Sequence, residues 1–367
     1  MVVAPIRLGR NLEVANRLVV APMTTYSSQP DGRLSEDEPP YLRRRAEGGF
    51  GLVMTAACCV HPSGWCFDGQ WQCSDDAFLP SLRAMADAIR SGGAKSVLQI
   101  HHGGRRCPGR LCGGQPVSAS AIPSEIAGAE VPRALLEAEI EEIIRCFADA
   151  TRRAKTAGFD AVEIHGANTY LLQQFVSPHS NRREDRWGRD RLAFPLAVAD
   201  AVLEAAGPDF PVGYRFSPEE PETPGIRLSD TFALVEALCE RPIAFLHISL
   251  RRYDQPSLHD PSSEPVIVQV ARRIRGRIPL IGVGQIRTKD EAEAAMALGA
   301  DMVAFARTAI TDPDWPIEVV AGENREPHLC VPQVGAARKL TIPAGLERRI
   351  YDVEGWFCVE GRWEQNR

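Results

Sequence analysis

The sequence lacks long apolar runs, an excess of positive charge and any stretch of low complexity. No apolar stretch approaches the roughly 18 residues of a membrane-spanning helix, and the N-terminus does not pair a basic segment with a long apolar one. Asp and Glu (48) outnumber Lys and Arg (42), so the net charge of −6 offers no broad attraction for nucleic acid or an anionic membrane. We therefore expect a cytoplasmic protein without nucleic-acid or membrane partners.

The cysteines also lack the grouping that a metal site or an iron–sulfur cluster requires. Among the 10 cysteines, Cys107 and Cys112 form a pair with a metal-like gap, but no second pair follows nearby. Cys58 and Cys59 lie inside an apolar run, where cysteine usually acts as a small hydrophobic side chain. We expect no bound metal.

What the sequence does contain is a series of short apolar runs rich in β-branched residues. Their apolarity is nearly continuous instead of alternating, which is typical of parallel strands buried on both faces. The eight runs are Leu18–Ala21, Gly51–Ala57, Ser96–Ile100, Ala161–His165, Val212–Phe216, Ala244–Ile248, Ile278–Val283 and Met302–Ala306.

Helical patterns separate these runs. Residues 140–147 place apolar side chains at the spacing i, i+3, i+4, i+7, and the pattern stops at Gly158. Thr288 and Glu291 form a capping box that opens another helix, which ends at Gly299. The alternation of strands and helices favours an α/β fold of the (β/α)8 type, the TIM barrel, over a doubly wound sheet.

A single domain accounts for the chain, because the 30 Gly and 28 Pro are scattered and no shift in composition marks a linker. We place the barrel in residues 1–320 and assign residues 321–367 to a C-terminal extension, packed on the barrel or at a subunit interface. Cys107–Arg133 is a Gly- and Pro-rich insertion after the third strand, which we expect at the rim of the active site.

Polar side chains gather where the predicted strands end. In such a barrel the carboxyl ends of the strands form the active site, and buried polar groups there must be paired or used. The side chains in question are Tyr26, Gln99, His165, Asn168, Tyr170, Arg215 and Arg307. So many polar groups at one end are difficult to assign to packing.

The loops after the seventh and eighth strands indicate a phosphate site. Gly282 and Gly284 permit a tight turn whose backbone N–H groups can face an anion, and the helix that opens at Thr288 adds its positive end. Arg307 supplies a charged fork after the eighth strand. The run 282–287 lacks the third glycine of a dinucleotide fingerprint, which disfavours a Rossmann interpretation.

Together these residues resemble the old yellow enzyme family over residues 1 to about 320, and more closely its short bacterial NAD(P)H-dependent flavin oxidoreductases. The resemblance lies in Pro22-Met23-Thr24, Gln99 with Gly103-Gly104-Arg105, His165 with Asn168 and Tyr170, Ser177-Pro178 with Asn181 and Arg183, Arg215, and Gly284 with Arg307. It implies noncovalently bound FMN and NADH or NADPH as the reductant. The implied substrate is a small enone, enal or nitro compound, reduced at its activated C=C bond.

The resemblance also implies roles for single residues. Flavin contacts would come from Pro22, Met23, Thr24, Ala57, Gln99 and Arg215, and phosphate contacts from Gly284, Ala306 and Arg307. Glycine is usual in the family where Ala306 stands, and some relatives have histidine where Asn168 stands. Asparagine can still donate a hydrogen bond, so the second difference tunes the site without abolishing its activity.

His165 and Asn168 would donate hydrogen bonds to the carbonyl or nitro oxygen of the substrate, and Tyr170 would protonate its α-carbon. Two preorganised donors favour the transition state, because negative charge develops on that oxygen. A phenol with an ordinary pKa of about 10 is protonated at neutral pH and can act as a general acid. Tyr26 and Trp71 would contribute to the wall of the substrate pocket.

Two alternative functions stay open. Another FMN barrel oxidoreductase would rely on a catalytic Cys or Ser, or on a basic appendage that binds RNA. A flavin-binding protein without turnover would be favoured by the loss of His165 or Tyr170, and both are present. The chain could form a homo-oligomer, and the sequence does not indicate the physiological substrate or the choice between NADH and NADPH.

Overall fold

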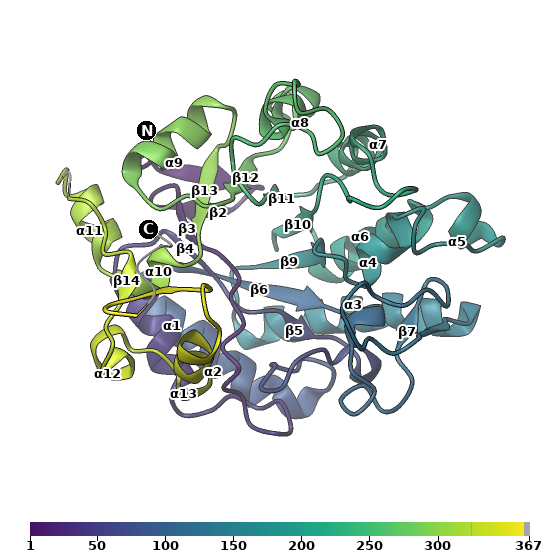
Figure 1. The fold of residues 1–367 in the computed structure, drawn as a ribbon, viewed down its shortest axis with the longest axis horizontal. Coiled ribbons are helices and arrows are strands. Elements are labelled where there is room, and N and C mark those ends of the chain that lie inside the picture. The colour runs from purple at the N-terminus through teal and green to yellow at the C-terminus, as the bar shows by residue number, and fades with distance from the viewer. Residues whose placement is uncertain (324, 363–367) are drawn as a thin grey trace.

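The computed structural model describes residues 1–323 and 325–362. Its centre is a closed barrel of eight parallel strands with helices on the outside (Figure 1). The barrel strands are β3 (Leu18–Val20), β4 (Leu52–Met54), β6 (Lys95–His101), β9 (Ala161–Gly166), β10 (Val212–Phe216), β11 (Phe245–Ser249), β12 (Leu280–Val283) and β13 (Met302–Phe305). Neighbours follow in chain order, and β13 pairs with β3 to close the barrel. The predicted (β/α)8 fold is therefore confirmed.

One predicted strand differs from the observed one. The run at 51–57 divides into β4, which ends at Met54, and β5 (Cys58–Cys59), which pairs with the end of β6. The backbone N–H of Gln99 donates to the hydroxyl of Thr55 at 3.1 Å. Because a side-chain oxygen takes this N–H, the chain leaves the backbone ladder at this point and rejoins it at β5.

Helices follow the barrel strands and cover them from outside. They are α1 (Glu38–Glu47), α2 (Leu79–Ser91), α3 (Glu137–Ala157), α4 (Leu171–Val176), α5 (Arg186–Arg189), α6 (Ala193–Ala206), α7 (Leu228–Cys239), α8 (Val266–Ile274), α9 (Lys289–Ala297), α10 (Thr308–Thr311) and α11 (Trp315–Val320). The amphipathic pattern predicted at 140–147 lies within α3, which is capped after Ala157 by Gly158 with φ 89°. Thr288 caps α9 and accepts the N–H of Glu291, as the capping box predicts.

Two apolar layers hold the barrel together. Inside it, side chains such as Phe245 and Met302 pack with Leu8, which belongs to the hairpin of β1 (Ile6–Leu8) and β2 (Leu12–Val14). This hairpin fills the amino-terminal end of the barrel, so the opposite end is the one available to ligands.

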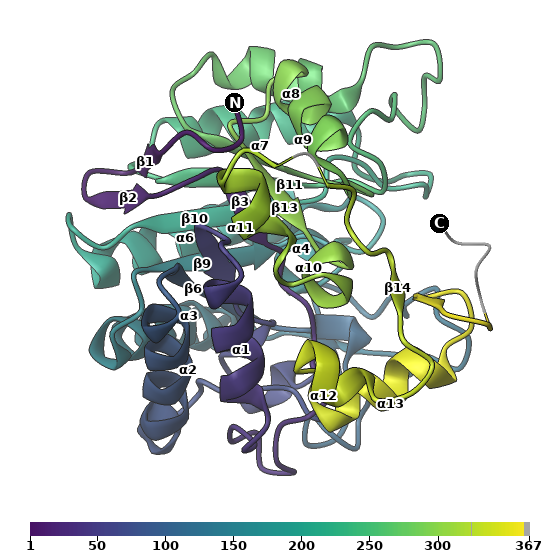
Figure 2. The ribbon, with the colours of Figure 1, turned by 90° about the vertical axis from the view of Figure 1, so that its left-hand side faces the viewer.

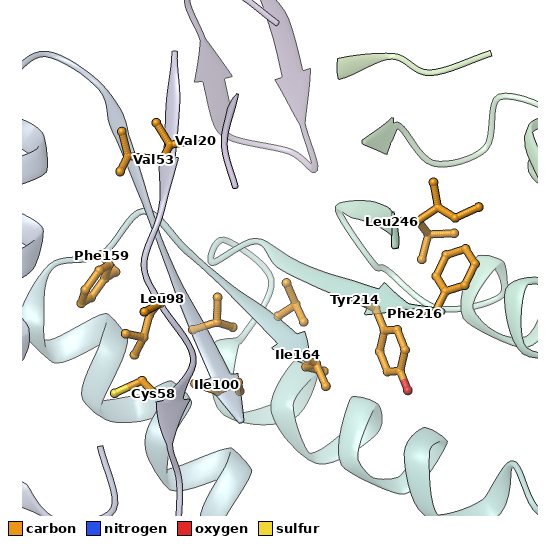
Figure 3. Packing of buried hydrophobic residues seen from close by; sticks show 14 of the residues in the cluster. Val20, Val53, Cys58, Leu98, Ile100, Phe159, Ile164, Tyr214, Phe216 and Leu246 are labelled. Atoms are coloured by element: carbon orange, nitrogen blue, oxygen red, sulfur yellow. The ribbon is translucent and has the colours of Figure 1, made fainter. Parts of the chain in front are cut away.

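The second layer lies between the strands and the helices. Figure 3 shows Leu98, Ile164 and Tyr214 on three neighbouring strands, with Ile164 and Tyr214 pointing toward the helical layer. These side chains are fully buried. Burial on both faces explains why the strands read as continuous apolar runs in the sequence.

Besides the β1–β2 hairpin, two more short pieces of sheet lie outside the barrel in the described residues. Within and just after the insertion that follows β6, β7 (Val117–Ser118) pairs with β8 (Arg133–Ala134). In the C-terminal extension, β14 (Cys330–Val331) pairs with β15 (Cys358–Val359), and a disulfide joins Cys330 to Cys358. Their spacing in the sequence does not indicate this pairing. None of the helices in residues 1–323 and 325–362 combines the length and hydropathy of a membrane span.

The extension lies beside the carboxyl end of the barrel (Figure 2). Besides β14 and β15 it contains α12 (Ala336–Leu340) and α13 (Ala344–Asp352). The backbone N–H of Gly345 donates to the hydroxyl of Ser27, in the loop after β3, at 2.8 Å. Arg307, directly after β13, donates to the carbonyl of Trp356 at 3.4 Å. The extension thus contacts the loops of the first and last barrel strands.

Candidate active site

Strand register brings several of the predicted polar residues together. Arg215 of β10 pairs with His165 of β9 and with His247 of β11, while Gln99 of β6 pairs with Glu163 of β9. Side chains alternate along a strand, so Glu163 and His165 point to the same side. All five residues are buried. The carboxyl end of the barrel therefore has a continuous polar floor made by β6, β9, β10 and β11.

A strained turn after β9 carries three of the predicted residues. Gly166 is required where the strand ends, because a Cβ there would lie 2.4 Å from the hydroxyl of Tyr214. Asn168 and Thr169 both occupy the left-handed region, with φ 58° and 61°. The backbone N–H groups of both residues are satisfied by side-chain oxygens that lie close to the turn. Helix α4 begins directly after Tyr170. Strain of this kind is typical of functional sites.

His165 is held as a neutral hydrogen-bond donor. Its Nδ1 accepts the backbone N–H of Ala167 at 3.3 Å, so the proton of the neutral ring resides on Nε2. Nε2 has no hydrogen-bond partner among the described residues. Burial, and to a smaller extent the charge of His101 and Arg215, lowers the pKa of His165 well below its ordinary value. His165 can therefore donate to a substrate oxygen without carrying a charge.

Asn168 is oriented by Ser249, a residue that the sequence analysis missed. The hydroxyl of Ser249 donates to Oδ1 of Asn168 at 2.9 Å, and Nη2 of Arg215 donates to the same hydroxyl oxygen at 3.2 Å. Because Oδ1 is occupied, the NH2 group of Asn168 is the part of the amide left for a ligand. Ser249 is the last residue of β11, and this place at the end of a barrel strand is the signal that could have identified it.

Tyr170 lies in an aromatic pocket with its hydroxyl available. Its ring makes edge contacts with His101, His165 and Phe67 at centroid distances of 4.4, 5.0 and 6.1 Å. The guanidinium of Arg106 lies 5.6 Å from the ring centroid. The hydroxyl forms no hydrogen bond with the described residues, and the side chain is 9% exposed. Burial raises the pKa of Tyr170, so the phenol keeps its proton at neutral pH.

These protonation states predict a flat pH profile for acceptor reduction. The pKa of His165 lies below and that of Tyr170 above their ordinary values, so neither group titrates between about pH 6 and about pH 9. We expect the rate of acceptor reduction by the reduced enzyme to be constant across this range. Stopped-flow measurements across the range check it. A limb with an apparent pKa of about 6.5 that disappears in His165→Asn would show that a charged imidazole takes part.

A buried carboxylate balances the positive charge of Arg215. Glu163 accepts from Nε2 of Gln99 at 2.6 Å and from Nδ1 of His247 at 2.8 Å. Burial alone would raise the pKa of Glu163, but His247, Arg215 and Gln99 together outweigh it and hold that pKa below its ordinary value. Burial lowers the pKa of His247, so its ring is neutral. Neither Glu163 nor His247 was among the predicted site residues, because their pairing depends on strands that are far apart in the sequence.

The predicted phosphate site is a cavity of about 250 Å³ beside Gly284. Its lining includes Ala306, Arg307 and Arg287. At Gly284, with φ 141°, a Cβ would lie 2.8 Å from the backbone nitrogen of Tyr253, so only glycine fits. Arg307 forms no ion pair with any described residue, and burial together with Arg287 lowers its pKa. An anion in this cavity would relieve the repulsion between the two guanidinium groups.

A buried donor, Nε of Arg215, and a buried acceptor, Nε2 of the neutral His247, fit a flavin with a single phosphate. Nε of Arg215 and Nε2 of His247 are buried without a hydrogen-bond partner in the described structure, which is unusual for polar atoms in a protein interior. Both belong to the polar floor, whereas the guanidinium of Arg307 faces the phosphate cavity. FMN would be held by Arg307 at its phosphate and by the polar floor at its ring.

Arg307→Ala is expected to weaken FMN retention by roughly tenfold or more, because it removes a charged donor from the phosphate cavity. Fluorescence of released FMN measures the dissociation constant. Arg272→Ala is the matched control, since Arg272 is exposed and pairs with Glu264 on the surface. The circular dichroism of the flavin-free Arg307→Ala protein should match that of wild type. Unchanged FMN affinity would place the phosphate elsewhere.

Most of the other predicted residues lie at the carboxyl end of the barrel. Pro22, Met23 and Thr24 follow β3 and are partly exposed at the carboxyl end of the barrel, where Ala57 follows β4. Tyr26 lies at the same end and makes edge contacts with Phe67 and Trp356 at 6.2 and 6.5 Å.

Trp71 does not line this opening. Its side chain is 1% exposed and packs in the core between the strands and the helices. Phe67, four residues earlier, is the aromatic side chain that contacts both Tyr26 and Tyr170. The sequence pattern alone does not distinguish these two aromatic residues.

Comparison with known proteins agrees with this geometry. Residues 2–326 match the NADH:flavin oxidoreductase / NADH oxidase family. The chain is 42% identical over 363 residues to a protein of Bacillus subtilis (strain 168) named "Probable NADH-dependent flavin oxidoreductase YqiG", with 96% of each chain covered. It is also 42% identical to an NADH:fumarate oxidoreductase of Klebsiella pneumoniae (strain 342), where the match covers 89% of this chain but only 36% of that protein.

A solved structure gives the same assignment. The old yellow enzyme homologue of Zymomonas mobilis superposes with a TM-score of 0.76 at 26% identity, covering 89% of this chain and 94% of that one. The family match, the fold and the residues of the site all indicate the same family. The chain belongs to the NADH:flavin oxidoreductase / NADH oxidase family, the old yellow enzymes, and is an FMN-dependent oxidoreductase that uses NADH or NADPH as its reductant.

Proposed function

We propose that this enzyme reduces the activated C=C bond of α,β-unsaturated carbonyl or nitro compounds. The observation that carries the proposal is the trio after β9. Nε2 of His165 and the NH2 group of Asn168 have no acceptor within the described structure, and the hydroxyl of Tyr170 is equally unpaired. The pocket is mostly buried and presents two unpaired N–H donors beside an unpaired phenol. This arrangement suits a substrate whose oxygen must be polarised and whose carbon must then be protonated.

When bound, FMN would supply the hydride chemistry that couples oxidation of the nicotinamide to reduction of the acceptor. His165 and Asn168 donate hydrogen bonds to the carbonyl or nitro oxygen. Negative charge grows on that oxygen in the transition state, so both bonds strengthen there. Tyr170 gives its proton to the α-carbon, and its deprotonated form regains a proton from solvent.

The buried thiols argue against a cysteine-based FMN barrel. Cys107 lies near Tyr170 in a small apolar cluster, and burial raises the pKa of its thiol well above the ordinary value. A thiol in such surroundings is a poor nucleophile and a poor acid at neutral pH. The name of the Klebsiella relative supports reduction of an activated alkene, although this chain corresponds to about a third of that protein.

Substrate class, location and assembly are further parts of the proposed function. We propose small enones, enals or nitro compounds as substrates, and a cytoplasmic enzyme whose barrel ends near residue 320. The extension contacts the rim of its own barrel, and a homo-oligomer in which it also meets a second subunit stays a prediction.

Steady-state turnover with product analysis tests the proposed function. Purified enzyme is supplied with NADH or NADPH and with 2-cyclohexenone, an enal or a nitroalkene under anaerobic conditions. One saturated product should form for each nicotinamide oxidised. If nicotinamide is oxidised only when oxygen is admitted, and no saturated product appears with any acceptor, the enzyme is an oxidase and the proposal fails.

A further inference from the structure

We propose that Arg106 binds a carboxylate on the acceptor, so that the preferred substrates are short activated alkenes that carry a negative charge. This inference rests on the proposed function and names a substrate class for the same site. Arg106 ends the short helix η3 (Gly104–Arg106), directly after β6, and was given no role by the sequence pattern.

Arg106 has no direct ion-pair partner among the acidic groups of the described structure. Its Nη1 donates to the hydroxyl of Thr169 at 2.9 Å, and its guanidinium lies 5.6 Å from the ring centroid of Tyr170. It forms no ion pair with any described residue. The adjacent Arg105 is different, because it donates to the carbonyl of Pro123 at 2.8 Å and pairs with Glu125 at 3.2 Å. Arg105 therefore holds the insertion in place, whereas the charge of Arg106 is available.

A cavity of about 310 Å³ opens beside Arg106, between η3 and the insertion. Phe67, Pro108, Ile126 and Ala127 contribute apolar walls. Glu130 also lines the cavity, but its carboxylate accepts the backbone N–H of Gly109 at 2.8 Å. A guanidinium beside apolar walls attracts an anion more strongly than one in open water, because solvent screens it less.

Tyr170 contacts both the predicted oxygen donor His165 and Arg106. Its ring lies 5.0 Å from the ring of His165 on the donor side and 5.6 Å from the guanidinium of Arg106. A substrate whose activating oxygen meets His165 and Asn168 and whose carboxylate meets Arg106 would bring its double bond close to Tyr170, which contacts both sides. Unsaturated diacids, their monoesters and unsaturated oxo acids have two polar ends separated by a double bond.

Monomethyl fumarate and dimethyl fumarate form a matched pair of probes that differ in one negative charge. Wild type should prefer the monoester in kcat/KM, and added salt should weaken the preference. Arg106→Gln should lower kcat/KM for the monoester about 10- to 100-fold more than for the diester, mainly through KM, because a charge-assisted hydrogen bond is lost. Arg106→Lys should restore part of the preference.

Arg110→Gln is the control for charge alone. Arg110 is exposed, lies at the start of the insertion that follows Arg106, and pairs with Asp68 on the surface. Its loss removes one positive charge from this face of the protein without touching the cavity. The ratio between monoester and diester should stay at the wild-type value in this variant.

Ligand binding gives a readout that is independent of turnover. Titration of the oxidised enzyme with 4-hydroxybenzoate and with its methyl ester, followed by absorbance, should show tighter binding of the acid in wild type but not in Arg106→Gln. If the acid binds in this way but no acceptor is reduced, the anion site stands and the proposed function fails. If both esters are reduced without a preference, or Arg106→Gln slows both equally, the carboxylate assignment is overturned while the proposed function stands.

Discussion

Tyr170→Phe is expected to slow reduction of an enone by about 10²–10⁴-fold, the range for the loss of a general acid, and to leave reduction of the flavin by NADH within a few-fold of wild type. The reason is that only the acceptor half-reaction needs a proton delivered to carbon. The substitution should be structurally mild, because the hydroxyl of Tyr170 has no partner among the described residues and the ring keeps its contacts with His101, His165 and Phe67.

Anaerobic stopped-flow absorbance follows each half-reaction separately. Tyr214→Phe is the matched control, since the hydroxyl of Tyr214 is also buried and unpaired but lies in the core. Nitroalkenes should be affected less than enones by Tyr170→Phe, because a nitronate is stable enough to leave and take a proton from water. Equal slowing of both half-reactions would make Tyr170 a structural or binding residue. No slowing of either would mean that the proton comes from another source.

The second large effect is expected from removing both oxygen donors. His165→Ala combined with Asn168→Ala should reduce enone turnover by about 10²-fold or more, the usual scale for lost oxyanion donors. A phenol bound to wild type should give a long-wavelength charge-transfer band, since a phenolate held by these donors would lie against the flavin. The double variant should lose this band.

Loss of packing is separated from loss of donors by a second double variant. His165 packs against His101 at a ring distance of 5.3 Å, so alanine leaves a cavity there. His165→Phe with Asn168→Leu keeps the bulk of both side chains and removes both N–H donors. We expect the same loss of turnover and of the band. Unchanged affinity for phenols in either variant would mean that the oxygen binds to other groups.

The barrel was predictable because each strand is buried on two faces and therefore forms a continuous apolar run. The run at 51–57 was too long, since the hydroxyl of Thr55 replaces a backbone acceptor and interrupts the pairing. A side-chain hydrogen bond of this kind leaves no periodic signal in the sequence. The orientation of Trp71 is likewise not marked in the sequence, because an aromatic residue near a strand end can face the opening or the core.

The site was predictable where chemistry marks the residue, as at His165, Asn168 and Tyr170. The residues that orient these side chains or balance charge at the site are recognised only from contacts between distant parts of the chain. Ser249 reaches Asn168 across 81 positions of the sequence, and His247 reaches Glu163 across 84. Such pairs follow from strand register, which the barrel topology fixes only after every strand has been placed.

The most direct test of the proposed chemistry is a single turnover of the wild-type enzyme without oxygen. Enzyme reduced by one equivalent of NADH is mixed with excess 2-cyclohexenone, and the absorbance of oxidised flavin is followed. We expect it to return at a rate that saturates with acceptor concentration, with one cyclohexanone formed per flavin. A flavin that stays reduced in the presence of enone, enal and nitroalkene, and is reoxidised only when oxygen is admitted, would contradict the assignment of His165, Asn168 and Tyr170 to alkene reduction.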